Sequence, residues 1–306
     1  MLVYIHVPFC STRCRYCAFY SSPLGRGVDP VASPAVRDYV DTLFMELAHW
    51  GDRLGGSPVQ TVFFGGGTPS LLPPRVIALI MERLGRYFNL APKAEVTLEA
   101  NPESLRGGHR AAQFLEAGVN RLSIGIQSLD EGMLRMLGRP HKAQDSLHAA
   151  FLAREAGCTN INVDLMWGLP GQSVRQWLQT LKDIMRMSPD HISAYGLTLE
   201  PGTPLELDVE EGRLLLPPER DQNIMFMEGA TLLEQHGYLH YEISNFARMG
   251  FQCRHNMGYW EGEDYLGLGP SATSTIGGRR WTNPASQRAW DARVREGSPG
   301  QDVEEL

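Results

Sequence analysis

The segment Cys10-Ser11-Thr12-Arg13-Cys14-Arg15-Tyr16-Cys17 follows an apolar run, Leu2–Val7, that is typical of a short strand. Three thiolates on one short loop can bind three corners of an iron–sulfur cubane. Position 19, where a fourth local cysteine would complete the shell, is Phe19. An open coordination position is what distinguishes catalytic metal sites from structural ones. Cys10, Cys14 and Cys17 therefore predict a [4Fe–4S] cluster with one iron left free.

The free iron can chelate the amino and carboxylate groups of S-adenosylmethionine (SAM), and electron transfer into the sulfonium can then cleave a carbon–sulfur bond. Two other interpretations of the same spacing stay open, a zinc site and three unrelated thiols. A structural zinc ion requires four ligands. The remaining cysteines, Cys158 and Cys253, are distant in the sequence.

Composition narrows the class of protein. The chain has 306 residues, of which 42% are hydrophobic and 21% charged, as in ordinary globular proteins. Its net charge is −7 and it contains no long basic run, so we expect no nucleic-acid partner. We find no apolar stretch approaching the roughly 18 residues of a membrane span, and no signal-peptide pattern at the start. We therefore expect a cytoplasmic protein, in a reducing compartment where cysteines serve as ligands.

Short β-branched runs alternate with amphipathic stretches, a pattern typical of βαβ units and a parallel sheet. Six such units are too few for a closed eight-stranded barrel, so we expect an α/β fold with an open, partial (β/α)6 barrel. The expected strands are Leu2–Val7, Thr61–Phe64, Val96–Ala100, Leu122–Ile126, Ile161–Met166 and Ile192–Leu197. The expected helices lie near 34–50, 74–88, 109–117, 130–136, 144–156 and 174–187.

The alternation of strand-like and helix-like stretches ends near Pro201. We therefore expect a barrel at 1–200 and a small C-terminal α+β cap at 201–278. We expect a helix near 220–236 and a strand at Tyr241–Phe246 within the cap. Residues 279–306 predict a polar tail with one short helix, Ala285–Glu296.

Polar residues end several of the expected strands. Phe64-Gly65-Gly66-Gly67-Thr68-Pro69 follows one strand, and its glycines permit close approach of the backbone to a ligand. Glu99, Gln127 and Asp164 end three others. Because the carboxyl ends of barrel strands converge on one face, these side chains predict a ring around the cluster. Taken singly, the glycines could form a plain flexible turn, and each polar residue could cap a loop.

These motifs together resemble the HemN/HemW family of radical SAM proteins, and more closely its HemW branch of haem chaperones. The resemblance runs from Tyr4 to about Gly278 and is carried by YIHVPFC, GGGTPS, EANPES, NRLSIGIQS, LGRPH, DLMWGLPGQ and HNMGYW. It implies the radical SAM barrel, a [4Fe–4S] cluster and SAM. The implied SAM contacts are Tyr4, Gly66, Gly67, Thr68, Glu99, Gln127, Arg139 and Asp164. Judged without the resemblance, Arg139 would be a solvated loop charge.

The family divides by function at two positions. The resemblance implies that the coproporphyrinogen dehydrogenases of the family carry a further cysteine two residues after the third cluster ligand, together with a longer N-terminal extension. Here the first position is Phe19, and Cys10 lies nine residues after Met1. In the chaperone branch the HNxxYW motif, here His255 to Trp260, is associated with haem. His255 is thus a candidate haem ligand and Cys253 a weaker one, while packing of the cap is the alternative.

The resemblance implies a haem chaperone that delivers haem to membrane or respiratory haem proteins, working at the inner membrane as a peripheral protein. It also implies an electron donor such as flavodoxin or ferredoxin. The alternative is an oxygen-independent enzyme acting on coproporphyrinogen III, and a third possibility is a radical enzyme with an unrelated substrate. We expect no coproporphyrinogen dehydrogenase activity. Family members usually continue into a C-terminal helical domain, whereas this chain stops at Leu306.

Overall fold

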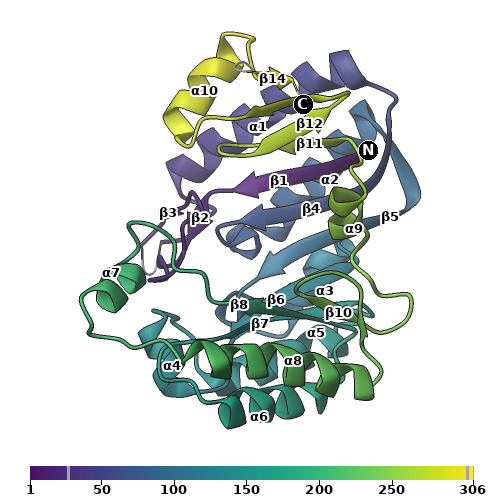
Figure 1. Cartoon of the computed structure of the whole chain (residues 1–306). Helices are drawn as coiled ribbons and strands as arrows, with labels where there is room; N and C mark the ends of the chain where they lie inside the picture. The colour runs from purple at the N-terminus through teal and green to yellow at the C-terminus, as the bar shows by residue number, and fades with distance from the viewer. Residues whose placement is uncertain (26–27, 301–302, 306) are drawn as a thin grey trace.

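Six parallel strands form the centre of a twelve-stranded mixed sheet (Figure 1). The computed structural model describes residues 1–25, 28–300 and 303–305. These six strands lie side by side in chain order. The strands are β1 (Leu2–Val7), β4 (Pro58–Gly66), β5 (Asn89–Ala100), β6 (Arg121–Gln127), β7 (Ile161–Trp167) and β8 (His191–Gly196). All six expected strands are confirmed.

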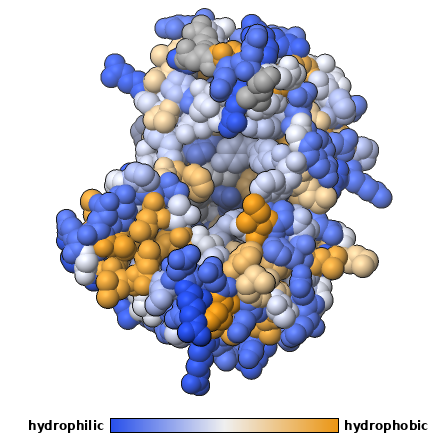
Figure 2. Space-filling view, viewed as in Figure 1, coloured by the Kyte–Doolittle hydropathy of each residue, from blue (hydrophilic) through white to orange (hydrophobic). Residues whose placement is uncertain are grey.

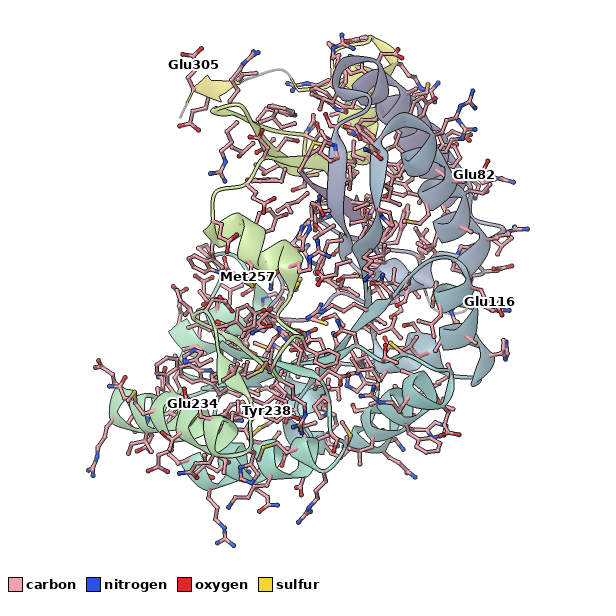
Figure 3. All side chains as sticks on the ribbon, turned by 90° about the vertical axis from the view of Figure 1, so that its right-hand side faces the viewer. Glu82, Glu116, Glu234, Tyr238, Met257 and Glu305 are labelled. Atoms are coloured by element: carbon pink, nitrogen blue, oxygen red, sulfur yellow. The ribbon has the colours of Figure 1, made fainter. Side chains whose placement is uncertain are left out.

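Helices follow these strands and cover the outer face of the sheet. In α2, Ile77, Ile80 and Leu84 repeat at helical spacing and are fully buried in the core, while Glu82 between them faces solvent. Figure 3 shows Glu82 of α2 and Glu116 of α3 on the outer side and Met257 on the opposite side. The helices are α1 (Pro34–Leu54), α2 (Pro74–Tyr87), α3 (His109–Glu116), α4 (Glu131–Met136), α5 (Ala143–Glu155) and α6 (Val174–Met185).

The segment after β8 extends the sheet at both edges. A hairpin joins β8 on one side, and four strands continue beyond β1 on the other. The edge strands, β14 and β9, do not pair in the part of the chain that the structure describes, so the barrel is open as expected. The strands are β9 (Leu239–His240), β10 (Asn245–Ala247), β11 (Tyr265–Leu268), β12 (Thr273–Ile276), β13 (Arg279–Thr282) and β14 (Glu304–Glu305).

The helices of this segment are α7 (Pro204–Glu210), α8 (Glu219–Gln235), α9 (Arg254–Trp260) and α10 (Gln287–Arg295). The helix expected near 220–236 is confirmed as α8. The strand expected at Tyr241–Phe246 is wrong over its first four residues, because the chain reverses there between β9 and β10. The Tyr241 N–H donates to the Asn245 carbonyl across this turn, at 3.2 Å.

The stretch expected to be a polar tail packs on α1. Trp281 stacks on Trp50, with ring centroids 5.0 Å apart, and Trp290 of α10 is fully buried beside Tyr39. The buried Glu46 carboxylate of α1 accepts from the Gly269 N–H at 2.8 Å and from the Asn283 amide at 2.7 Å. These contacts tie the last strands to the outer layer of the barrel.

The parallel order of the six central strands puts their carboxyl ends at one edge of the sheet. Figure 2 shows that the surface is hollowed near the middle of the molecule. None of the described helices is both long and apolar enough to cross a membrane.

Candidate cofactor site

The three-cysteine loop leaves the carboxyl end of β1. A small parallel pair, β2 (Phe9–Cys10) and β3 (Ser22–Pro23), closes the base of the loop. The Arg15 N–H donates to the Leu137 carbonyl at 3.0 Å, which attaches the middle of the loop to the end of α4. Cys10, Cys14 and Cys17 are free thiols and all three are partly exposed.

The glycine turn after β4 lies directly under this loop. The Gly67 N–H donates to the Val7 carbonyl at 2.8 Å, and the Thr68 N–H donates to the Phe9 carbonyl at 2.7 Å. A Cβ added at Gly67 would lie 2.5 Å from the Phe9 oxygen and 3.0 Å from Cys10 Sγ. Gly66 has a φ of 108°, which side chains rarely adopt. Close approach to the cysteine loop therefore requires glycine at 67, and the backbone angle favours glycine at 66.

A chain of hydrogen bonds joins Cys10 to Cys14 through three other side chains. The Thr68 hydroxyl donates to Cys10 Sγ at 3.7 Å and accepts from Asn101 Nδ2 at 3.0 Å. Arg139 donates to Asn101 Oδ1 at 2.5 Å, to the Gly125 carbonyl at 2.7 Å and to Cys14 Sγ at 3.4 Å. The guanidinium of Arg139 is thus a partner of the cysteine loop and not a solvated loop charge.

Asn101 was not singled out from the sequence, although it lies in EANPES directly after a strand. Gln127, which the sequence predicted as a SAM contact, belongs to the same group as Asn101. The pairing of β6 with β7 shifts between Gly125 and Gln127, and Gln127 has a φ of 66°. A Cβ at Gly125 would lie 3.0 Å from Gln127 Nε2, 3.2 Å from Asn101 Oδ1 and 3.3 Å from the Arg139 guanidinium. These three polar groups therefore converge over Gly125.

The residues fit a cubane cluster better than a single metal ion. Among the residues that the structure describes, no three His, Cys, Asp or Glu side chains converge on one ion position. A cubane needs no such convergence, because each thiolate binds its own iron. Donors that reach Cys10 and Cys14 also suit thiolate ligands, since hydrogen bonds to sulfur tune such clusters. Cys158 and Cys253 are buried elsewhere. Their thiols donate hydrogen bonds to the Asn160 carbonyl and to the Glu95 carboxylate, respectively.

Beside the loop lies a cavity of about 220 Å³ that contains four of the predicted positions. Burial, and after it the nearby Asp164 charge, raises the pKa of Glu99 to about 8. Burial also raises the pKa of Asp164, which accepts from Ser123 at 2.9 Å and from Asn162 at 2.8 Å. Two enclosed carboxyl groups favour a cationic ligand such as a sulfonium or an ammonium group. The cavity is lined by Tyr4, Phe19, Phe63, Gly66, Glu99, Arg121, Ser123, Asn162, Asp164, Ser193, Tyr195 and Asn256.

Sequence reasoning missed Arg121, which lines this cavity from β6 and is only 2% exposed. Burial by itself lowers the pKa of Arg121, but the charges of Cys253, Glu95 and Asp164 outweigh it and raise the pKa. Arg121 in turn opposes the rise in the pKa of Glu99 and Asp164. It balances part of the acidic charge of the site.

His255, the predicted haem ligand, lies outside this cavity. It belongs to α9 and packs on Phe63, with ring centroids 5.0 Å apart. Its Nδ1 pairs with the Thr61 hydroxyl at 2.7 Å and its Nε2 with the Tyr259 hydroxyl at 2.9 Å. Burial lowers the pKa of His255 to about 3, so the ring is neutral. Both ring nitrogens of His255 thus have hydrogen-bond partners within the chain.

Comparisons with known proteins identify the family of the chain. Residues 4–184 match the radical SAM superfamily, whose members use a [4Fe–4S] cluster and SAM. The chain is 39% identical to the heme chaperone HemW of Escherichia coli, over 90% of this chain and 70% of that protein. The solved structure of coproporphyrinogen III oxidase (HemN) from Escherichia coli, a radical SAM enzyme, superimposes with a TM-score of 0.85 at 26% identity, covering 100% of this chain and 72% of the other.

The chain is also 40% identical to the bovine mitochondrial radical S-adenosyl methionine domain-containing protein 1, over 99% of this chain and 66% of that protein. It spans 59% of the length of the mouse and zebrafish counterparts. The predicted resemblance is thus confirmed: the chain belongs to the radical SAM superfamily, in the family that contains the heme chaperone HemW.

Proposed function

We propose that this chain binds a [4Fe–4S] cluster and SAM and handles haem as a chaperone, delivering it to membrane or respiratory haem proteins. The observation that carries the proposal is Phe19, in the position where the coproporphyrinogen-converting branch is expected to have a cysteine. Its ring is 67% exposed and lines the cavity beside the three-cysteine loop. An exposed aromatic ring offers a surface for a flat ligand and no proton or electron chemistry.

In this proposal Cys10, Cys14 and Cys17 would hold the cluster, which when bound supplies an electron to SAM. Gly66, Gly67 and Thr68 would meet the amino-acid end of SAM through the backbone of their turn. Glu99 and Asp164 would accept from its ammonium and ribose groups, and Tyr4 would line the same cavity. Arg139 and Gln127 would set the geometry of the loop. A small redox protein of the flavodoxin or ferredoxin class would supply the electron.

The second candidate function is conversion of coproporphyrinogen III, which the structural similarity to HemN favours. The two functions give opposite results in one anaerobic experiment. The reconstituted chain is supplied with SAM, a reductant and coproporphyrinogen III, and a second sample is titrated with haem. We expect a haem-dependent change in absorbance and no protoporphyrinogen IX. Product formed over many turnovers, without stable haem binding, would refute the chaperone function.

Phe19→Cys provides the matched variant for this experiment, because it restores the cysteine that the enzyme branch is expected to carry. We expect it to bind haem more weakly, because the ring surface is lost, and to remain inactive, since one thiol does not supply the rest of a substrate site.

A further inference from the structure

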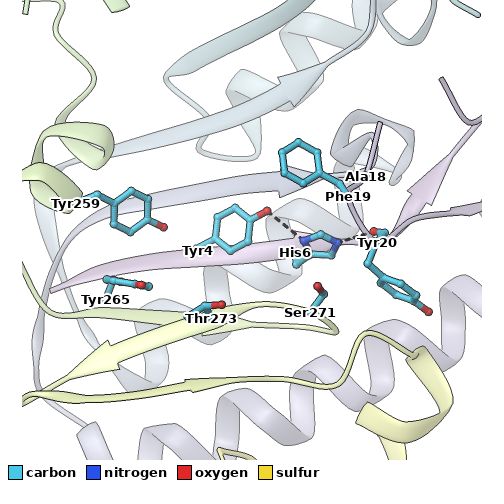
Figure 4. A pocket seen from close by; sticks show the side chains of 9 residues that line it. All are labelled: Tyr4, His6, Ala18, Phe19, Tyr20, Tyr259, Tyr265, Ser271 and Thr273. Atoms are coloured by element: carbon cyan, nitrogen blue, oxygen red, sulfur yellow. Dashed lines mark hydrogen bonds between the residues drawn. The ribbon is translucent and has the colours of Figure 1, made fainter. Parts of the chain in front are cut away.

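A second hollow, which we call the tyrosine pocket, adjoins the cofactor cavity and encloses about 420 Å³. It shares Tyr4 and Phe19 with that cavity, so these two side chains border both hollows. Figure 4 shows its side chains around the opening between β1, β11 and the cysteine loop. The pocket is lined by Tyr4, His6, Ala18, Phe19, Tyr20, Tyr259, Tyr265, Ser271 and Thr273.

The lining indicates the class of ligand. Five of its nine side chains are Tyr or Phe rings, and none is Asp, Glu, Lys or Arg. Tyr259 and Tyr265 meet edge to face, with centroids 4.7 Å apart, which fixes the angle between two walls. Aromatic walls without charge select a flat, largely apolar ring. The volume lies within the range of small-molecule sites and would be poorly filled by a single nucleobase.

The same side chains offer iron few ligands. His6 Nε2 donates to the Tyr20 carbonyl at 2.8 Å, and His6 Nδ1 therefore accepts from the Tyr4 hydroxyl at 3.2 Å. Both ring nitrogens of the imidazole are thereby used. Burial raises the pKa of the Tyr4 and Tyr259 phenols, which opposes phenolate ligation. His255 donates to or accepts from Tyr259 at 2.9 Å and acts as its positioning residue.

We propose that the tyrosine pocket is the tetrapyrrole site of this chain, and that it holds the macrocycle by its ring face and not through the iron. The inference rests on the proposed haem-handling function and adds where the ligand binds and what is recognised. It places the ring edge next to the SAM cavity, across Tyr4 and Phe19. It also predicts that a metal-free porphyrin binds about as well as haem.

The test is a titration of the cluster-loaded, full chain with two probes, metal-free protoporphyrin IX and ferric haem. We expect the two dissociation constants to agree within about fivefold, because ring contacts dominate. Tyr265→Ala removes one wall of the pocket and should weaken the binding of both probes about tenfold. Tyr265→Phe keeps the ring and removes a phenol that could meet iron, and should change the binding of neither probe. Phe151→Ala, an exposed aromatic residue on α5, is the control for loss of a ring outside the pocket.

Thr273→Trp fills the pocket and is a second variant in case Tyr265→Ala folds poorly. Cluster absorbance and SAM affinity report whether each variant is folded. Loss of porphyrin binding with SAM affinity retained supports the site. Haem binding without binding of the metal-free porphyrin, or equal losses in Tyr265→Phe and Tyr265→Ala, would overturn recognition by the ring. Binding of both probes unchanged in Tyr265→Ala and Thr273→Trp would move the site elsewhere and leave the proposed function standing. A wild-type chain that binds neither probe would refute the proposed function itself.

Discussion

Asn101 connects the glycine turn to the cysteine loop, and its removal should disorder both. Its Nδ2 donates to Thr68 and its Oδ1 accepts from Arg139. A neutral hydrogen bond contributes about 0.5–1.5 kcal/mol and one to a charged group about 1.5–3 kcal/mol. Asn101→Ala should therefore lower the free energy of unfolding by about 2–4 kcal/mol. It should also weaken SAM binding, because Thr68 and Arg139 lose the partner that fixes their positions.

Anaerobic urea denaturation gives the first quantity and a SAM titration of the cluster-loaded chain gives the second. Asn101→Asp is the informative companion, since a carboxylate keeps the bond from Arg139 but cannot donate to Thr68. It should recover most of the stability and only part of the SAM affinity. Asn89→Ala, at an exposed position at the start of β5, is the control and should change neither quantity. Wild-type stability and SAM affinity in Asn101→Ala would refute the reasoning.

Two further predictions concern carboxyl groups. Asp164→Ala should weaken SAM binding by about 1–3 kcal/mol, because the site loses an enclosed acceptor. Asp183→Ala, a half-buried carboxylate of α6 that pairs with Arg186, is its control. An unchanged SAM titration would remove Asp164 from the site. Burial raises the pKa of Glu46 from 4.5 to about 7, so the native state holds a proton that the unfolded state releases between these values. The stability of the wild type should fall by about 3 kcal/mol as pH rises from 4.5 to 7 and then level off. Glu46→Gln should lack that part of the pH dependence and Glu82→Gln should keep it; parallel profiles of wild type and Glu46→Gln would contradict the assignment.

The six strands and their helices could be predicted because they depend on local pattern. β-Branched runs alternate with amphipathic stretches, and prolines mark the starts of α1 and α2 at Pro34 and Pro74. The grouping of Gly66, Glu99 and Asp164 also followed from sequence, since parallel strands put their carboxyl ends together. Tyr4 followed from the family resemblance. All four line one cavity.

What could not be predicted depends on register and on contacts between distant segments. Asn101 is one residue past its strand, and only the shifted β6–β7 pairing brings Gln127 and Arg139 over the same glycine. The burial of Arg121 depends on acidic partners from β5 and β7. His255 and Tyr259 share one motif, yet only Tyr259 reaches a pocket, because successive turns of α9 face different neighbours.

Iron analysis of the anaerobically reconstituted chain, with electron paramagnetic resonance of the reduced protein before and after SAM is added, tests the central claim most directly. We predict about four irons per chain and a signal that changes when SAM binds the open position. Cys14→Ala should abolish the cluster and Cys158→Ala should leave it intact. Bound zinc with no uptake of iron, or a cluster signal indifferent to SAM, would contradict the account.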